Sequence, residues 1–199
     1  MRRTLFLAAV LFSLASCASG GRNETASSQA TPAALPTQFP GVLQFSFVDR
    51  FHDGSINSNA PAATPTKRGA LILPWPWGTG HIASLTVLAG YRYTYRNVAI
   101  ASAGDVLAFA AAKPFSLGGA DVRAFVDISD QGHVHRVFQA SLTPATDSGP
   151  VWKGYSIPLK AYKSRRIQMT FGADSINGSA EAAWAAFAFP ATYTPTRTK

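Results

Sequence analysis

The stretch that decides the fold is Arg166-Ile167-Gln168-Met169-Thr170-Phe171, in which polar and apolar side chains alternate along the whole length. Successive side chains of a β-strand point to opposite faces, so this period of two is typical of a strand with one buried face. The pattern recurs near the other end of the chain, in Leu43-Gln44-Phe45-Ser46-Phe47. The two stretches therefore predict strands that contribute to one core.

Eight further segments also predict strands. They are Ala70–Leu73, Ile82–Leu88, Tyr91–Ile100, Asp105–Ala111, Asp121–Ser129, His133–Leu142, Trp152–Leu159 and Ala183–Phe189. Alanine favours a helix in the last segment, but its aromatic residues and its place after a strand and a turn favour a strand. About ten short strands separated by turns predict an all-β fold, a jelly-roll-like antiparallel β-sandwich. We place this domain at 39–190 and a C-terminal tail at 191–199.

The first residues have the features of an export signal. Arg2 and Arg3 precede an apolar run over residues 5–12. A run this short cannot span a bilayer, which takes ~20 residues, so 1–16 is predicted to be a signal peptide. The signal ends in Leu14-Ala15-Ser16-Cys17, which resembles the lipobox of bacterial lipoproteins.

The lipobox resemblance implies that Cys17, the sole cysteine, is lipidated and becomes the mature N-terminus. A thiolate suits thioether formation with a diacylglycerol donor. Two or three acyl chains, palmitate among them, would anchor the protein stably in a membrane. Residue 18 is Ala and not the Asp that retains enterobacterial lipoproteins in the inner membrane, which favours the outer membrane of a bacterial envelope. Small and polar residues dominate 17–38, which predicts a disordered tether with a reach of roughly 25 Å.

The second half of the chain resembles the galactose-binding-like jelly rolls found beside many bacterial carbohydrate-active enzymes. The segments that carry this resemblance are Gly104–Phe109, Val122–Asp127, Trp152–Leu159, Ile167–Ala173 and Glu181–Trp184. The resemblance supports the β-sandwich and implies a carbohydrate-binding module.

Trp75 and Trp77 stand in the most unusual stretch, Leu73-Pro74-Trp75-Pro76-Trp77-Gly78. Proline lacks the donor that a central strand needs, so a rigid loop or a sheet edge is predicted here. Rigid tryptophan faces stack on the apolar faces of sugar rings, which makes both residues candidates for ligand binding. The alternatives are that they plug one end of the sandwich or contact a protein.

Tyr91, Tyr93 and Tyr95 alternate with Arg92, Thr94 and Arg96, so the three tyrosines share one face of a strand. That face is a candidate surface for a glycan or a lipid headgroup. The alternative is a half-buried sheet face with the hydroxyl groups at its rim.

Lys160, Lys163, Arg165 and Arg166 are a third candidate site in a chain of net charge +8. Such a cluster attracts anionic glycans, lipopolysaccharide phosphates or anionic lipids. The alternative is a solvated hairpin that blunts a sheet edge. Nucleic acid is not an expected partner, because the signal peptide predicts export.

Metal and catalytic sites receive little support. His133 and His135 share a strand face, but no third ligand follows at a suitable spacing. Asp49, His52 and Asp53 suggest acid–base chemistry only if a cleft encloses them. The chain has no nucleophile elbow, zinc-protease motif, P-loop or dinucleotide fingerprint. We expect no catalytic function, no metal and no cofactor.

These observations predict a lipid-anchored envelope lipoprotein whose non-catalytic β-sandwich binds an extracytoplasmic glycan or surface polymer. One alternative is a structural or protein-interaction accessory of an envelope or secretion assembly. Another is a small polysaccharide hydrolase, because two carboxylates can pair in space without a sequence motif.

Overall fold

The structure is a computed structural model that describes residues 31–33, 41–58, 69–114, 121–147, 149–177, 180 and 183–196. The predicted signal peptide, Cys17 and all of the predicted tether except Thr31–Ala33 lie outside these residues. No helix among the described residues is long and apolar enough to cross a membrane. The helical elements that the structure describes are two short 3₁₀ turns, η1 (Phe51–Asp53) and η3 (Lys160–Tyr162).

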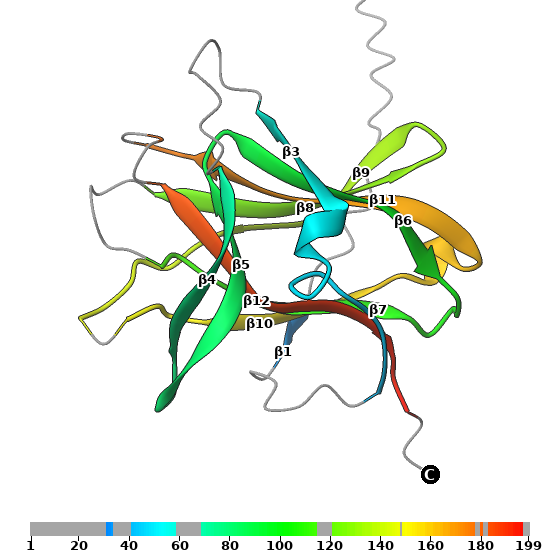
Figure 1. Cartoon of the computed structure of the whole chain (residues 1–199), viewed down its shortest axis with the longest axis horizontal. Helices are drawn as coiled ribbons and strands as arrows, with labels where there is room; N and C mark the ends of the chain where they lie inside the picture. The colour runs from blue at the N-terminus through cyan, green and yellow to red at the C-terminus, as the bar shows by residue number, and fades with distance from the viewer. Residues whose placement is uncertain are drawn as a thin grey trace, which may run out of the picture.

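Twelve β-strands build the described part of the chain (Figure 1). They are β1 (Thr31–Ala33), β2 (Val42–Ser46), β3 (Gly54–Ser58), β4 (Ala70–Trp77), β5 (Gly80–Leu88), β6 (Tyr91–Ile100), β7 (Val106–Ala112), β8 (Val122–Asp130), β9 (His133–Ser141), β10 (Lys153–Pro158), β11 (Arg165–Ser175) and β12 (Trp184–Thr194).

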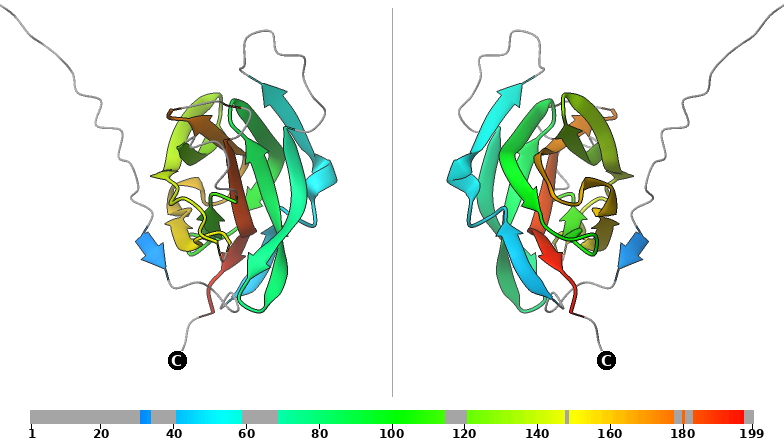
Figure 2. Two further views of the ribbon diagram at one scale, coloured as in Figure 1. Left: turned by 90° about the vertical axis from the view of Figure 1, so that its left-hand side faces the viewer. Right: turned by 90° about the vertical axis from the view of Figure 1, so that its right-hand side faces the viewer.

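The strands form two sheets that pack face to face (Figure 2). A seven-stranded sheet has the order β1-β10-β7-β12-β5-β4, with β2 paired to β12. A five-stranded sheet has the order β3-β6-β11-β8-β9. The recorded strand pairs are antiparallel. The predicted all-β antiparallel sandwich is confirmed.

The core lies between the inner faces of the two sheets, and aromatic rings dominate it. Phe171 of β11 contacts Phe187 of β12, with ring centroids 5.1 Å apart. Phe187 in turn contacts Phe109 of β7, at 5.6 Å. All three rings are fully buried and meet edge to face, the geometry that aromatic quadrupoles favour. The alternation that predicted a strand at 166–171 thus reflects one core-facing row of side chains.

Two boundaries differ from the sequence-based prediction. Thr31–Ala33 lie within the predicted tether but pair with β10 as β1. Backbone pairing at an open sheet edge needs no apolar side chains, which is why the composition of this segment gave no sign of it. β12 continues to Thr194, four residues into the predicted tail, because residues 191–194 pair with β2.

Candidate functional site

Strand β12 changes partner halfway along one of its edges. Its first half, Trp184–Ala188, pairs with β5, and its second half, Ala191–Thr194, pairs with β2. Between the halves, Pro190 has no N–H to donate, and Phe189 adopts a positive φ of 49°. The register against β7 shifts at the same point, between Ala188 and Ala191. A bulge of this kind redirects a side chain, and here Phe189 is 38% exposed.

A groove of about 330 Å³ opens where β5 and β2 separate beside this bulge. Its lining residues are Leu43, Ser46, Val48, Asp49, Ile82, Ala83, Phe189, Pro190 and Ala191. We call it the aromatic groove. Most of the lining is apolar, while Ser46 and Asp49 contribute a hydroxyl and a carboxylate. Small-ligand sites have this combination of apolar walls and a few polar groups.

An aromatic cluster extends from the groove across the outer face of the seven-stranded sheet. The rings of Trp77 and Phe189 are perpendicular, with centroids 5.4 Å apart. Trp77 also contacts Trp152, again at 5.4 Å. Both tryptophans pack on a small buried cluster that includes Ala110 and Ala188. The small alanine side chains leave room for the two large rings to pack against the sheet.

Hydrogen bonds hold two tryptophans of this face, Trp75 and Trp152, in place. Trp152 Nε1 donates to the carbonyl oxygen of Pro76 at 2.9 Å, which joins the β4–β5 hairpin to the segment before β10. Figure 1 shows this hairpin passing in front of β12 and β10. Trp75 Nε1 donates to Thr86 Oγ1, also at 2.9 Å. We call this surface, with Trp75, Trp77 and Trp152, the aromatic face.

Trp75 and Trp77 were predicted on a rigid loop or an edge, and they lie on the edge strand β4. Each is partly buried. They face outward from the sheet and do not plug the main core. Sequence reasoning missed Phe189 and Trp152 as neighbours of Trp77. The Phe189-Pro190 dipeptide inside an apolar segment was the available signal, because proline interrupts a strand ladder.

Tyr91, Tyr93 and Tyr95 do not form a binding surface, which corrects one of the predicted sites. Their exposed fractions are 6%, 6% and 0%, and their rings belong to the main core. The hydroxyl of Tyr93 donates to the carbonyl oxygen of Phe51, and that of Tyr95 donates to the carbonyl oxygen of Phe47 at 2.6 Å. Burial raises the pKa of both phenols, and Asp53 raises the pKa of Tyr93 further. The rings offer no face to a ligand.

Lys160, Lys163, Arg165 and Arg166 are exposed, as the prediction of a basic surface requires. Arg165 forms an ion pair with Asp130. Arg166 Nη1 donates to the carbonyl oxygen of Asn97 at 3.4 Å. A role for these four side chains in binding stays a prediction.

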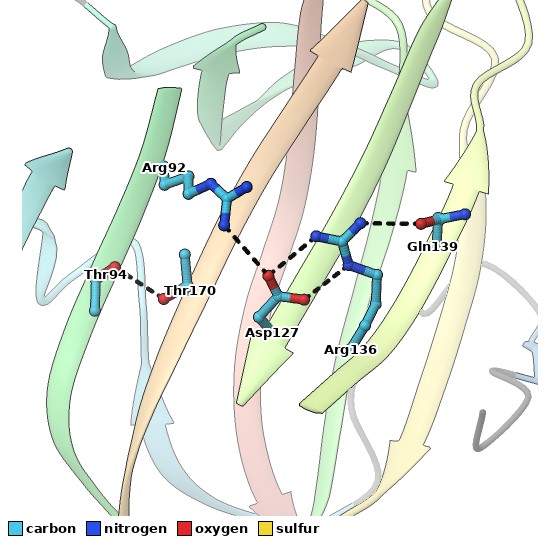
Figure 3. Close-up of polar contacts among 6 residues, drawn as sticks. All are labelled: Arg92, Thr94, Asp127, Arg136, Gln139 and Thr170. Atoms are coloured by element: carbon cyan, nitrogen blue, oxygen red, sulfur yellow. Dashed lines mark hydrogen bonds and ion pairs between the residues drawn. The ribbon is translucent and has the colours of Figure 1, made fainter. Parts of the chain in front are cut away.

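The outer face of the five-stranded sheet carries a charged network that sequence reasoning missed (Figure 3). Asp127 of β8 binds Arg136 of β9 through both oxygens, at 2.8 and 3.1 Å. Arg92 of β6 reaches the same carboxylate at 3.8 Å, and Arg136 also donates to Gln139 at 3.0 Å. The hydrogen bonds that Arg136 donates to Asp127 raise the pKa of the arginine. We call this surface, with Arg92, Asp127 and Arg136, the arginine face.

A buried phenylalanine lies beneath this network. The guanidinium carbons of Arg136 and Arg92 lie 4.0 and 5.1 Å from the centroid of the Phe125 ring, within cation–π range. On the neighbouring strand, a Cβ at Gly172 would come within 2.1 Å of that ring, so any larger residue there would force the ring or the backbone to shift. Asp127 has both oxygens occupied and its side chain is 7% exposed. The network therefore joins the strands and leaves Asp127 little capacity for a ligand.

The residues considered for metal binding and acid–base chemistry lie in separate parts of the described structure, with Asp49 in the aromatic groove. No group of three or more His, Cys, Asp or Glu side chains among the described residues is arranged to hold a metal ion. His133 and His135 are exposed on β9. Asp53 is paired with Arg50 at 2.9 Å, and His52 is exposed beside it.

Comparison with known proteins finds similar structures but no similar sequences. No protein-family model matches the chain, and no curated protein does. A structure of TmCBM61 in complex with β-1,4-galactotriose has a TM-score of 0.49 and 14% identity, covering 78% of this chain and 94% of that chain. The xylan-binding module CBM15 has a TM-score of 0.46 and 11% identity, covering 80% and 99%. A CBM51 module from Clostridium perfringens in complex with methyl-galactose has a TM-score of 0.40 and 13% identity, covering 71% and 88%. The structural neighbours thus include carbohydrate-binding modules. The ligands named here were bound by those modules.

Proposed function

We propose that this chain is a lipid-anchored lipoprotein of a bacterial outer membrane, and that its β-sandwich binds an extracytoplasmic glycan without catalysis. The lipobox at Leu14-Ala15-Ser16-Cys17 supports the anchor. The aromatic groove supports glycan binding, and it is the main observation behind the proposal.

The groove has the chemistry that a sugar ring needs. One face of a pyranose ring presents C–H groups, which stack on an aromatic ring, and its hydroxyl groups bind carboxylates and hydroxyls. Phe189 offers an exposed ring that Trp77 holds in place from the side. Asp49 and Ser46 supply the polar partners in the same groove.

The hydrolase alternative finds less support in this groove. A glycosidase generally needs two carboxyl groups, about 5–9 Å apart, on either side of the scissile bond. Among the residues described as lining the groove, Asp49 supplies the one carboxyl group. We therefore propose binding without bond cleavage.

A glycan-array experiment with the purified full chain tests the binding site. The variants are Trp77→Ala and Phe189→Ala, and the control is Val134→Ala, which removes an exposed apolar side chain on the other sheet. Loss of a stacking ring is worth ~1–3 kcal/mol, so we expect a ten- to hundredfold loss of affinity in the two variants and none in the control. Absence of binding to any glycan would reject the proposal and favour a protein partner. Equal glycan binding by the control and by the two variants, provided that the variants still unfold cooperatively, would also reject the proposal.

The proposed anchor has a separate test. Labelled palmitate supplied to producing cells is expected to enter the protein and to be absent from Cys17→Ser. The variant is also expected to leave the membrane fraction. Labelling that persists in Cys17→Ser would reject the lipobox assignment while leaving the glycan site untouched.

A further inference from the structure

A second pocket, of about 340 Å³, lies where β2, the η1 turn, the end of β6 and the start of β11 meet. Three arginines from separate parts of the chain line it, namely Arg50, Arg96 and Arg166. It shares no lining residue with the aromatic groove. We call it the arginine pocket.

The charges in this pocket are unbalanced. Asp53 is its one carboxylate among the described lining residues, and it is paired with Arg50 at 2.9 Å. Within the described ranges, no ion pair to a carboxylate is recorded for Arg96 or Arg166. Arg166 donates only a long hydrogen bond, 3.4 Å, to the carbonyl oxygen of Asn97. The guanidinium groups of Arg96 and Arg166 are therefore available to bind an anion.

A local irregularity in β6 positions Arg96. The register between β6 and β11 shifts between Ile167 and Met169, so Arg96 and Asn97 together oppose a single residue of β11. Asn97 adopts a positive φ of 59°, a conformation that asparagine tolerates better than most residues. Bulges redirect side chains and recur next to functional sites. The shift brings Arg96 into the same pocket as Arg166, which comes from the neighbouring strand.

We infer that the arginine pocket binds the carboxylate or sulfate group of an acidic sugar. Guanidinium groups form paired hydrogen bonds with such oxyanions. Phe45 supplies an apolar wall, and the Arg50 guanidinium carbon lies 5.2 Å from its ring centroid. Gln44 and Asn97 line the pocket as well, with amide groups suited to sugar hydroxyls. The inference rests on the proposed function in one respect, which is that the bound anionic group belongs to a sugar.

A phosphate group of a lipid would present similar oxyanion chemistry. The aromatic wall and the two amides favour the sugar, because a glycerol phosphate headgroup has no ring to place against Phe45. A soluble headgroup is therefore a necessary competitor in the test.

Isothermal titration calorimetry of the purified full chain with glucuronate, glucose and glycerol phosphate tests the inference. We expect glucuronate to bind at least tenfold more tightly than glucose, and more tightly than glycerol phosphate. Arg96→Gln and Arg166→Gln are each expected to weaken glucuronate binding about tenfold, the loss of one charge-assisted bond of about 1.4 kcal/mol. Lys153→Gln is the matched control, because it removes an exposed cation that does not line the pocket.

Three results would overturn the inference. These are equal affinities for glucuronate and glucose, equal effects of Arg96→Gln and Lys153→Gln, or tighter binding of glycerol phosphate than of glucuronate. Trp77→Ala is expected to leave glucuronate binding unchanged. A failure of the aromatic groove on the glycan array is therefore distinguishable from a failure of the arginine pocket.

Discussion

The two outer faces of the sandwich use aromatic rings in opposite ways. On the aromatic face, Trp77 lies over small alanines and one of its neighbours, Phe189, remains 38% exposed. On the arginine face, Phe125 is fully buried beneath Arg92 and Arg136. One face presents ring surface to the solvent, whereas the other covers a ring with cations.

The two faces therefore differ in what they offer to a ligand. The polar groups of the arginine face bind one another, whereas the aromatic face has exposed ring surface. Asp127 accepts two hydrogen bonds from Arg136 and lies near Arg92 as well, so the partners of this carboxylate come from the protein itself (Figure 3). The indole N–H groups of Trp75 and Trp152 on the aromatic face are likewise paired, but the rings of this face keep an apolar surface beside a groove. We therefore expect substitutions on the arginine face to affect stability and substitutions around Phe189 to affect binding.

The largest expected effect is on the arginine face. Asp127→Ala removes the carboxylate that pairs with two arginines, and each arginine side chain is 35% exposed. Removing one partner of a buried ion pair is costly, and partial exposure reduces the cost to about 2–3 kcal/mol of unfolding free energy. Urea denaturation measures it. The exposed carboxylate in Asp147→Ala is the control, and an equal loss in both variants would show that the network contributes nothing to stability.

A steric substitution tests the role of the Phe125 ring that lies beneath the network. Gly172→Ala places a methyl group 2.1 Å from the Phe125 ring, so we expect about 2 kcal/mol of destabilisation from overpacking. Gly104→Ala is the matched control, because its nearest neighbour is Ser102 Oγ at 3.6 Å. Phe125→Leu is expected to recover part of the loss in the double variant. No recovery would mean that the ring is not the obstacle.

A smaller effect is expected on the aromatic face. Trp152→Phe keeps an aromatic ring but removes the hydrogen bond to Pro76, which is worth about 1 kcal/mol. Thermal unfolding measures the loss, and the glycan array measures whether glycan binding changes when this bond is removed. Unchanged stability would show that the hairpin does not depend on this bond.

The smallest effect is expected away from both faces. Lys163→Ala truncates an exposed side chain after the η3 turn, and such changes usually lie within about 0.5 kcal/mol. A loss of more than 1 kcal/mol in urea denaturation would show that the predicted basic surface supports the fold.

Much of the fold could be predicted from local patterns. Alternation predicted the strand at Ile167, Met169 and Phe171, and all three side chains are buried. Proline chemistry predicted that Trp75 and Trp77 would lie on a loop or an edge, and β4 is an edge strand. These features depend on neighbours along one strand, so the sequence records them directly.

The sites depended on contacts that no local pattern records. The tyrosine row of β6 has a clear period, but alternation does not tell which of its faces meets the other sheet. Arg50, Arg96 and Arg166 come together only because strands far apart in sequence become neighbours. The aromatic groove exists because β12 exchanges β5 for β2 as its partner.

The short strand β1 has a consequence for the proposed anchored protein. Because the chain joins β10 at residue 31, residues 18–30 alone separate Cys17 from the sandwich, at most about 45 Å of fully extended backbone. β1 also covers the backbone groups of β10, which would otherwise form a longer open edge able to pair with another molecule. The connection to the proposed membrane anchor and the strand that protects the edge of β10 against aggregation are thus parts of one continuous segment, residues 18–33. A chain shortened to begin at residue 39 would lose both.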